Sequence, residues 1–287
     1  MGHTIGVVGG SGLYALEALT DVREVRVDTP FGSPSDVLVR GKLGDTELVF
    51  VPRHGRGHRY TPTEIPYRAN VWALKSLGCD WLVSVSAVGS LREEIAPGHV
   101  VLVDQYIDKT VARPQTFFGE GVVAHAAFGD PTCDTLRGYL HQACVAVGAT
   151  VHLGGTYVCM EGPVFSSRAE SNLHRSWGAS VIGMTAMPEA KLAREASLSY
   201  ATLAFATDYD CWHPHHDAVT VDQVMAVLSA NVGRAKAILT AAVPRIAAHP
   251  GEAPMADAMR TAIMTPKAAI DEAARQRLGP LLKRYLT

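Results

Sequence analysis

The sequence is poor in charged residues and has no excess of basic ones. Asp, Glu, Lys and Arg make up 19% of its 287 residues, and 26 basic against 28 acidic side chains leave a formal net charge of −2. Sequence-independent binding of nucleic acid needs a broad positive surface, so no nucleic-acid partner is expected. No uninterrupted apolar run approaches the roughly 20 residues of a membrane-spanning helix, so we expect a soluble protein with no membrane partner.

Cysteines are few, and their spacing indicates no site. The five cysteines are an odd number and include no Cys-x-x-Cys pair. A disulfide framework or a zinc ribbon is therefore not expected, and the absence of a secretory signal agrees with a cytoplasmic location. His213, His215 and His216 lie in a proline-containing loop without a second cluster of ligands. We therefore expect no metal site.

Apolar segments alternate with helical patterns along most of the chain. Apolar residues make up 47% of the sequence, which is enough for a large core. Short apolar runs, several of them apolar on both faces, predict strands at residues 5–8, 47–51, 81–87, 100–103, 151–155, 157–160, 181–182 and 199–206. Helical patterns occupy residues 66–77, 133–147, about 167–178, and a long stretch from 220 onwards. Such alternation is typical of an α/β layer fold.

A composition change near residue 248 marks the end of this pattern. Residues 249–254 are rich in proline and small side chains and predict a linker, and residues 268–286 have the pattern of one more helix. We therefore predict a main domain over residues 1–247. The linker and C-terminal helix over residues 248–287 would pack on the same domain or on a neighbouring subunit.

Two segments that directly follow predicted strands could bind an anion. In residues 9–12, three glycines leave backbone N–H groups accessible and Ser11 adds a hydroxyl, although a glycine-rich turn would look the same. In the second segment, Arg53 can hold two phosphate oxygens with its forked guanidinium, and His54 can donate a further hydrogen bond. A basic surface loop is the alternative there.

Small and hydroxyl-bearing residues at two other strand ends fit the same chemistry. Ser86 and Ala87 lie near the end of a predicted strand, where small side chains either allow tight packing or leave a ligand room near the backbone. Met184 and Thr185 precede Pro188, which suits the first turn of a helix. The hydroxyl of Thr185 and the free amides of a helix start suit an anion, and a solvent-exposed helix cap would have the same sequence.

A pair of aspartates follows the apolar strand predicted at residues 199–206. Asp208 and Asp210 are two residues apart at the end of residues 199–206. Burial and a like-charged neighbour raise the pKa of such a carboxyl group, so that it can hold a proton and donate it near neutral pH. Two carboxylates also suit an exocyclic amine or a divalent cation, and the spacing alone does not choose between them.

Taken together in chain order, these motifs resemble the trimeric purine nucleoside phosphorylase superfamily, and in particular its methylthioadenosine phosphorylase branch. The resemblance covers about residues 4–245 and rests on the following motifs: Gly9-Gly10-Ser11-Gly12-Leu13, Asp28-Thr29-Pro30-Phe31-Gly32, Arg53-His54-Gly55, Gly89-Ser90-Leu91-Arg92, Glu161-Gly162-Pro163, Phe165-Ser166-Ser167-Arg168-Ala169-Glu170, Met184-Thr185, Pro188-Glu189 and Thr207-Asp208-Tyr209-Asp210.

The resemblance implies a fold and an activity. The fold would be a three-layer α/β arrangement with a central mixed sheet flanked by helices. The activity would be the reversible phosphorolysis of 5′-methylthioadenosine to adenine and 5-methylthioribose 1-phosphate. Inorganic phosphate would be a co-substrate, and neither a metal nor an organic cofactor would take part. The resemblance also implies a homo-oligomer, either a trimer or a dimer of trimers.

The resemblance further implies roles for individual residues. Asp208 would protonate or hydrogen-bond N7 of the leaving base, with Asp210 acting on the amino group, so both are predicted as catalytic. The predicted phosphate site consists of Ser11, Arg53, His54, Ser86, Ala87 and Thr185. The predicted nucleoside site consists of Phe165, Ser166, Met184, Val221 and Val224, with His125 reaching in from an adjacent subunit. Met184 would lie against the ribose and its backbone would hydrogen-bond a sugar hydroxyl.

Three alternatives stay open on the sequence. A methylthioinosine or broader purine nucleoside phosphorylase differs in the base it accepts, and the two carboxylates favour a 6-amino over a 6-oxo purine. A hydrolytic nucleosidase would use water in place of phosphate. A non-catalytic purine-binding protein would bind the same ligand without turnover.

Overall fold

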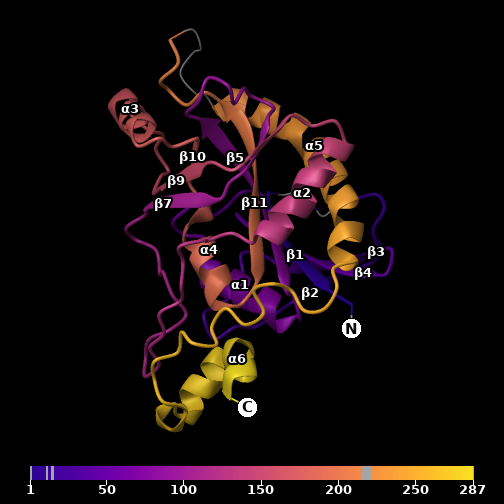
Figure 1. Ribbon diagram of the computed structural model, residues 1–287, viewed down its shortest axis with the longest axis vertical. Helices are drawn as coiled ribbons and strands as arrows, with labels where there is room; N and C mark the ends of the chain where they lie inside the picture. Colours follow the sequence, from indigo (N-terminus) through magenta and orange to yellow (C-terminus); the bar gives the residue numbers. More distant parts are fainter. Residues whose placement is uncertain (1, 11, 14–15, 215–220, 287) are drawn as a thin grey trace.

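A mixed eleven-stranded sheet runs through the centre of the protein (Figure 1). The computed structural model describes residues 2–10, 12–13, 16–214 and 221–286, and for residues 221–230 it describes the backbone alone. The main strand order is β2-β3-β4-β1-β5-β10-β9-β7, while β11 pairs with β5 and continues the sheet to β6 and β8. The strands are β1 Thr4–Gly9, β2 Thr20–Val25, β3 Leu38–Leu43, β4 Thr46–Pro52, β5 Trp81–Ser90, β6 Val100–Leu102, β7 Gln105–Lys109, β8 Val151–Leu153, β9 Thr156–Met160, β10 Val181–Gly183 and β11 Ser199–Asp208.

Strand β5 is the centre of this sheet because three strands pair with it. Strands β1 and β11 run parallel to it, one on each side, from Trp81 onwards. Strand β1 pairs no further than Ser84, whereas β5 continues to Ser90, where β10 joins it in antiparallel pairing. Since β4 is also parallel to β1, the carboxyl ends of β4, β1, β5 and β11 point to the same edge of the sheet.

Helices cover both faces of the sheet and make three layers. One core contains Leu74 of α1 (Tyr67–Ser76), Leu192 of α4 (Ala186–Glu195) and Leu278 of α6 (Glu272–Leu286). The other contains Leu140 of α2 (Asp134–Ala146) and Leu239 of α5 (Val221–Ala247). Figure 1 shows α2 beside α5, away from α1 and α4. The predicted three-layer fold with a central mixed sheet is confirmed.

The nine-residue helix α3 (Arg168–Ser176) lies apart from these layers, beside β9 and β10 (Figure 1). It begins with a capping box. The Glu170 amide donates to Ser167 Oγ at 3.3 Å, and the Ser167 amide donates to Glu170 Oε2 at 2.7 Å. Each of these bonds satisfies a backbone N–H that the first helical turn cannot use.

The C-terminal segment packs on its own chain. The Trp72 indole of α1 donates to the Arg277 carbonyl of α6 at 3.2 Å, and Leu278, Leu281 and Leu282 are buried in the core that α1 and α4 share. A short 3₁₀ helix, Lys267–Ala269, precedes α6. The predicted boundary at residues 247 and 248 stays a prediction. Among the described residues, no helix is long and apolar enough to cross a membrane.

Candidate active site

The candidate site lies at the carboxyl ends of the parallel strands. In open α/β sheets, this edge is where ligands bind, because the loops that follow the strands diverge there. Arg53 follows β4, Ser86 and Ala87 lie near the end of β5, Asp208 ends β11, and Thr185 precedes α4. Ser11, which follows β1, lies outside the described residues.

Arg53 is buried and is held from several sides. Only 3% of it is exposed. Its Nε and Nη2 donate to the two carboxylate oxygens of Glu189 at 2.9 and 3.2 Å, and Nη2 also donates to Ser84 Oγ at 2.7 Å. Nη1 donates to the Val85 carbonyl at 3.0 Å. Burial opposes the guanidinium charge, but Glu189 more than offsets it and raises the pKa of Arg53 above its ordinary value.

These bonds leave Arg53 with little to offer a ligand. A guanidinium has five N–H groups, and the bonds to Glu189, Ser84 and Val85 occupy four of them. One N–H, on Nη1, is left. The role of Arg53 in binding phosphate stays a prediction, and in this geometry one edge of its guanidinium is paired with the Glu189 carboxylate.

His54 has a defined tautomer. Its Nδ1 lies 2.9 Å from the Tyr60 carbonyl, which can only accept, so Nδ1 carries the proton. Burial lowers the pKa of His54 to about 4, although the bond to Tyr60 acts in the opposite direction. At neutral pH the ring is uncharged and its single N–H is used. The role of His54 in binding phosphate stays a prediction, and in this tautomer its Nε2 is an acceptor.

Two buried hydroxyls meet between β5 and the start of α4. Ser86 Oγ and Thr185 Oγ1 are 3.3 Å apart, and both residues are less than 10% exposed. Thr185 occupies the N-cap position of α4, but its side chain makes no capping hydrogen bond. Its hydroxyl is therefore directed to Ser86 rather than to the helix backbone. Ser86 and Thr185, predicted from two separate patterns, lie together, and Ala87 follows Ser86 on β5.

The two aspartates lie against a glycine of β5. Asp208 pairs with Gly89 across the sheet, and a Cβ at Gly89 would be 2.9 Å from Asp208 Oδ1 and 3.3 Å from Asp210 Cβ. Asp208 Oδ1 accepts from the Asp210 amide at 2.7 Å, and its Oδ2 accepts from Thr207 Oγ1 at 2.6 Å. A side chain at position 89 would therefore displace the Asp208 carboxylate.

Burial changes the protonation of this pair. It raises the pKa of Asp208, and the adjacent Asp210 charge adds to the effect, although the bonds from Thr207 and the Asp210 amide oppose it. Burial also raises the pKa of Asp210. Asp210 Oδ2 is buried and has no hydrogen-bond partner in the described part of the chain. A buried acceptor of this kind suits a donor from a ligand.

The hydroxyl pair and the aspartate pair both lie beside the second half of β5. Ser86 and Gly89 are three residues apart on β5, and a strand rises about 3.3 Å per residue, so these two positions are roughly 10 Å apart along the strand. This span is comparable to a sugar with a planar base. A wide hollow of about 360 Å³ lies elsewhere, lined by Val22, Arg23, Glu24, Val39 and Arg56, and contains none of the predicted site residues.

A hydrogen bond connects the segment before α3 to the segment after β11, near the aspartate pair. Ser166 is buried, and its carbonyl accepts a hydrogen bond from the Cys211 thiol at 3.3 Å, which links the residue to the segment after β11. Phe165 is 44% exposed. The Met184 carbonyl accepts from Arg113 at 2.6 Å. If the predicted bond from the Met184 backbone to a sugar hydroxyl uses this oxygen, the hydroxyl shares it with Arg113. The side chains of Val221 and Val224 lie outside the described residues.

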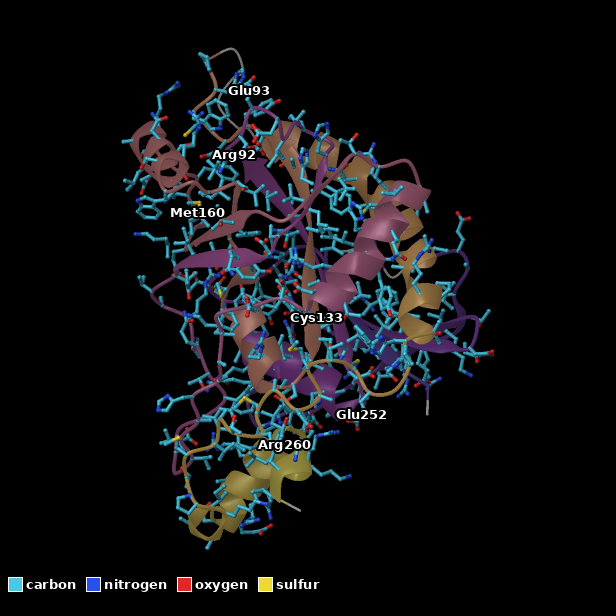
Figure 2. All side chains as sticks on the ribbon, viewed as in Figure 1. Arg92, Glu93, Cys133, Met160, Glu252 and Arg260 are labelled. Atoms are coloured by element: carbon cyan, nitrogen blue, oxygen red, sulfur yellow. The ribbon has the colours of Figure 1, made fainter. Side chains whose placement is uncertain are left out.

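His125 is not brought to this site within the chain. It is exposed, and its amide donates to the Ala262 carbonyl at 2.8 Å. The neighbouring residues Ala124 and Ile263 form a β-bridge. Figure 2 labels Arg260 at the lower end of the molecule, beside α6, whereas Met160 and Arg92 lie toward the opposite end with β9 and β10.

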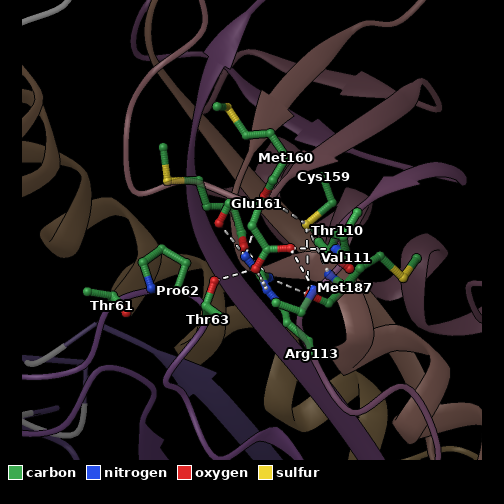
Figure 3. Close-up of polar contacts among 12 residues, drawn as sticks. Thr61, Pro62, Thr63, Thr110, Val111, Arg113, Cys159, Met160, Glu161 and Met187 are labelled. Carbon is green, nitrogen blue, oxygen red and sulfur yellow. Dashed lines mark hydrogen bonds and ion pairs between the residues drawn. The ribbon is translucent and has the colours of Figure 1, made fainter.

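Arg113 and Glu161 organise the backbone behind the site, and the sequence patterns did not single out Arg113 (Figure 3). Arg113 Nη1 donates to the carbonyls of Met184 and Met187 at 2.6 Å, and Nη2 donates to the Glu161 carbonyl at 2.6 Å. Its Nε donates to Glu161 Oε1 at 3.2 Å. The Arg113 side chain is fully buried. One guanidinium thereby connects the segments before α3 and α4.

Glu161 completes this network with its carboxylate. It accepts from Thr63 Oγ1, and its Oε2 accepts from the Val111 amide at 2.5 Å. Partial burial opposes the charge, but the bonds from Thr63, Val111 and Ala112 lower the pKa of Glu161 to about 2. The carboxylate therefore stays ionised beside Arg113 across the physiological range.

The fold and the site together define a class of protein. A doubly covered sheet that brings buried hydroxyls, one guanidinium N–H and a carboxylate pair to its strand ends suits a ligand with an oxyanion at one end and a polar base at the other. The chain belongs to the phosphorylase superfamily, whose sequence model matches residues 4–244. The resemblance drawn from the motifs is thereby confirmed.

Individual relatives show which members of the superfamily the chain is similar to. The chain is 57% identical over 287 residues to S-methyl-5′-thioadenosine phosphorylase of Geobacter sulfurreducens, covering all of both chains. It is 55% identical over 285 residues to the protein of the same name from Thermosynechococcus vestitus, covering 98% of this chain and 99% of the relative. Among solved structures, a methylthioadenosine phosphorylase from an Antarctic soil metagenomic library has a TM-score of 0.94 at 47% identity, covering 98% and 99% of the two chains. The Schistosoma mansoni enzyme in complex with adenine has a TM-score of 0.83 at 40% identity, covering 86% and 93%.

Proposed function

We propose that the chain catalyses the reversible phosphorolysis of S-methyl-5′-thioadenosine to adenine and 5-methylthioribose 1-phosphate. The observation that carries the proposal is the placement of the Ser86–Thr185 hydroxyl pair and the Asp208–Asp210 pair beside the second half of one strand, β5. Relatives that bear this enzyme name at 55–57% identity over their full length support it.

The reaction breaks the bond between N9 of adenine and C1′ of the sugar, and it forms a bond from a phosphate oxygen to C1′. Positive charge builds on the sugar and negative charge on the departing base. Phosphate held by the free N–H of Arg53 and the hydroxyls of Ser86 and Thr185 is the nucleophile. Asp208 supplies a proton to N7, so that the base leaves as neutral adenine.

Asp210 determines which base fits. Its buried, unpartnered Oδ2 accepts from the 6-amino group of adenine, whereas a 6-oxo group would present a second acceptor. Two buried acceptors that face each other without a proton between them leave a hydrogen bond unmade, which weakens binding by about 1–3 kcal/mol. Adenine nucleosides are therefore preferred over inosine and methylthioinosine. In this proposal, phosphate is a co-substrate, and no metal or organic cofactor takes part.

A substrate panel tests the proposal. We expect adenine release from S-methyl-5′-thioadenosine to depend on phosphate and to saturate with it, and release from methylthioinosine to be at least several-fold slower. 5′-Deoxyadenosine, adenosine and inosine complete the panel. Equal turnover without phosphate would indicate a hydrolase instead. Tight adenine binding with no turnover at any phosphate concentration would indicate a binding protein.

We further propose that the protein is a homo-oligomer, a trimer or a dimer of trimers, in which His125 lies at the site of a neighbouring copy. His125 is exposed and is held to Ala262 rather than to its own site. Sedimentation velocity should give a species of at least three chains. His125→Ala should raise the KM for the nucleoside in that oligomer, and an unchanged KM or a monomer would contradict the proposal.

A further inference from the structure

We propose that Glu189 is a positioning residue for phosphate: it fixes Arg53 so that one Nη1 N–H faces the bound anion. The inference rests on the proposed phosphorolysis and adds a residue that no pattern in the sequence connects to phosphate. Glu189 does not contact substrate in this proposal. It acts through Arg53, which makes the contact.

The geometry of the pair carries the first step. Glu189 lies in the first turn of α4, and its side chain is 2% exposed beside the 3% of Arg53. The two carboxylate oxygens meet Nε and Nη2 at 2.9 and 3.2 Å, a fork-to-fork arrangement that allows little rotation of the guanidinium plane. With this edge fixed and Nη1 bonded to the Val85 carbonyl, the last N–H has a single direction.

Glu189 is itself fixed by the strand on the far side of β5. The Tyr200 hydroxyl of β11 donates to Glu189 Oε1 at 3.2 Å, and Thr202 Oγ1 donates to the Tyr200 oxygen at 3.0 Å. The Arg53 fork is therefore anchored to β11 as well as to α4. A carboxylate with three defined donors has no freedom to follow a shifted guanidinium.

Placement on α4 connects the pair to the rest of the phosphate site. Thr185, the N-cap residue of α4, precedes Glu189 by four residues and presents its hydroxyl beside Ser86. One short segment therefore supplies a hydroxyl for the anion and the clamp for the arginine. The ion pair is also electrically neutral, so phosphate is bound through the direction of one N–H and two hydroxyls and not through an unpaired charge.

The test compares Glu189→Gln with a matched carboxylate on the same helix. Glu195 is also buried in α4, and it accepts from Thr116 Oγ1 at 2.6 Å and from the Phe117 amide at 2.8 Å. Glu189→Gln places an amide N–H₂ against Nε or Nη2 and breaks the fork. We expect its KM for phosphate to rise about ten-fold or more while its KM for the nucleoside changes less than about three-fold. Glu195→Gln should change neither KM by more than about two-fold.

Phosphate binding measured by calorimetry in the absence of nucleoside gives a readout that does not need turnover. We expect the phosphate Kd of Glu189→Gln to rise by the same factor as its KM. If Glu189→Gln does not fold, Tyr200→Phe removes the 3.2 Å bond that anchors Glu189 Oε1, and its phosphate KM should rise about three-fold. A folded Glu189→Gln with unchanged phosphate affinity, or with both KM values raised equally, overturns the inference, as does an unchanged phosphate KM in Tyr200→Phe. Wild-type turnover that ignores phosphate refutes the proposed function, and phosphate calorimetry on the same variants then still decides the role of Glu189.

Discussion

Asp208→Asn is expected to lower kcat for S-methyl-5′-thioadenosine by about 10²–10⁴-fold, the usual contribution of a positioned general acid. Asparagine has the size of aspartate and keeps one oxygen for the donors at Thr207 and the Asp210 amide, so the loop should stay folded. It cannot deliver a proton to N7. Steady-state kinetics at saturating phosphate measure the effect.

The pH dependence of the same variant identifies the proton donor. Burial raises the pKa of Asp208, and the like charge of Asp210 adds to it. A required acid with a raised pKa is protonated below that pKa and loses its proton as the pH rises through it. The kcat of the wild type should therefore fall on the alkaline side of this pKa, and Asp208→Asn should lack that limb.

The controls separate chemistry from base recognition. Asp210→Asn should reduce the preference for 6-amino over 6-oxo purines, because the amide can donate to a 6-oxo group that the carboxylate repels. Asp134→Asn, on an exposed carboxylate of α2, should leave kcat unchanged. A kcat within about ten-fold of the wild type in Asp208→Asn, with the alkaline limb retained, would assign the proton to another group.

The parts of the fold that were predicted correctly are those whose burial is visible in the local sequence. Strand β11 is buried along nearly its whole length, and most of its residues are apolar. Strand β2 was missed because it is an edge strand with five of its six residues exposed, and its sequence is therefore polar on both faces. Strand β7 was missed for a related reason, since Gln105, Asp108 and Lys109 interrupt its apolar residues.

The same distinction holds at the site. Asp208 and Asp210 could be predicted as a pair because they are neighbours in the chain, and Arg53 because it follows a strand. The number of N–H groups that Arg53 can offer depends on Glu189, which lies 136 residues away. The tautomer of His54 depends on the Tyr60 carbonyl, a backbone group with no sequence signature. Long-range partners of this kind decide what a correctly chosen side chain can do.

Arg113 is the clearest case of a residue whose importance is set by such partners. It lies in the irregular segment after β7, where no periodic pattern or motif marks it. Four backbone carbonyls surround its guanidinium, those of Met160, Glu161, Met184 and Met187. The cation also faces the Glu161 carboxylate, and it lies over the Tyr67 ring with its Cζ 5.6 Å from the centroid.

Arg113→Met is expected to lower the free energy of unfolding by about 3–5 kcal/mol, since removing one member of a buried ion pair leaves the other uncompensated. Methionine fills part of the volume but leaves the Met184 and Met187 carbonyls without their donor. The melting temperature should fall by about 10 °C, at roughly 2–4 °C per kcal/mol for a chain of this size. Urea denaturation and calorimetry measure both quantities.

A change in substrate binding distinguishes Arg113 from a residue that only stabilises the fold. Loss of the bond to the Met184 carbonyl frees the segment before α4, so the KM for the nucleoside should rise at temperatures where the variant is folded. Arg113→Lys keeps the charge but cannot reach carbonyls on both sides, so it should recover part of the stability and little of the KM. Arg260→Met removes an exposed pair with Asp257 and should cost less than about 1 kcal/mol. If Arg113→Met is as stable as Arg260→Met, the network in Figure 3 does not hold the site together in solution.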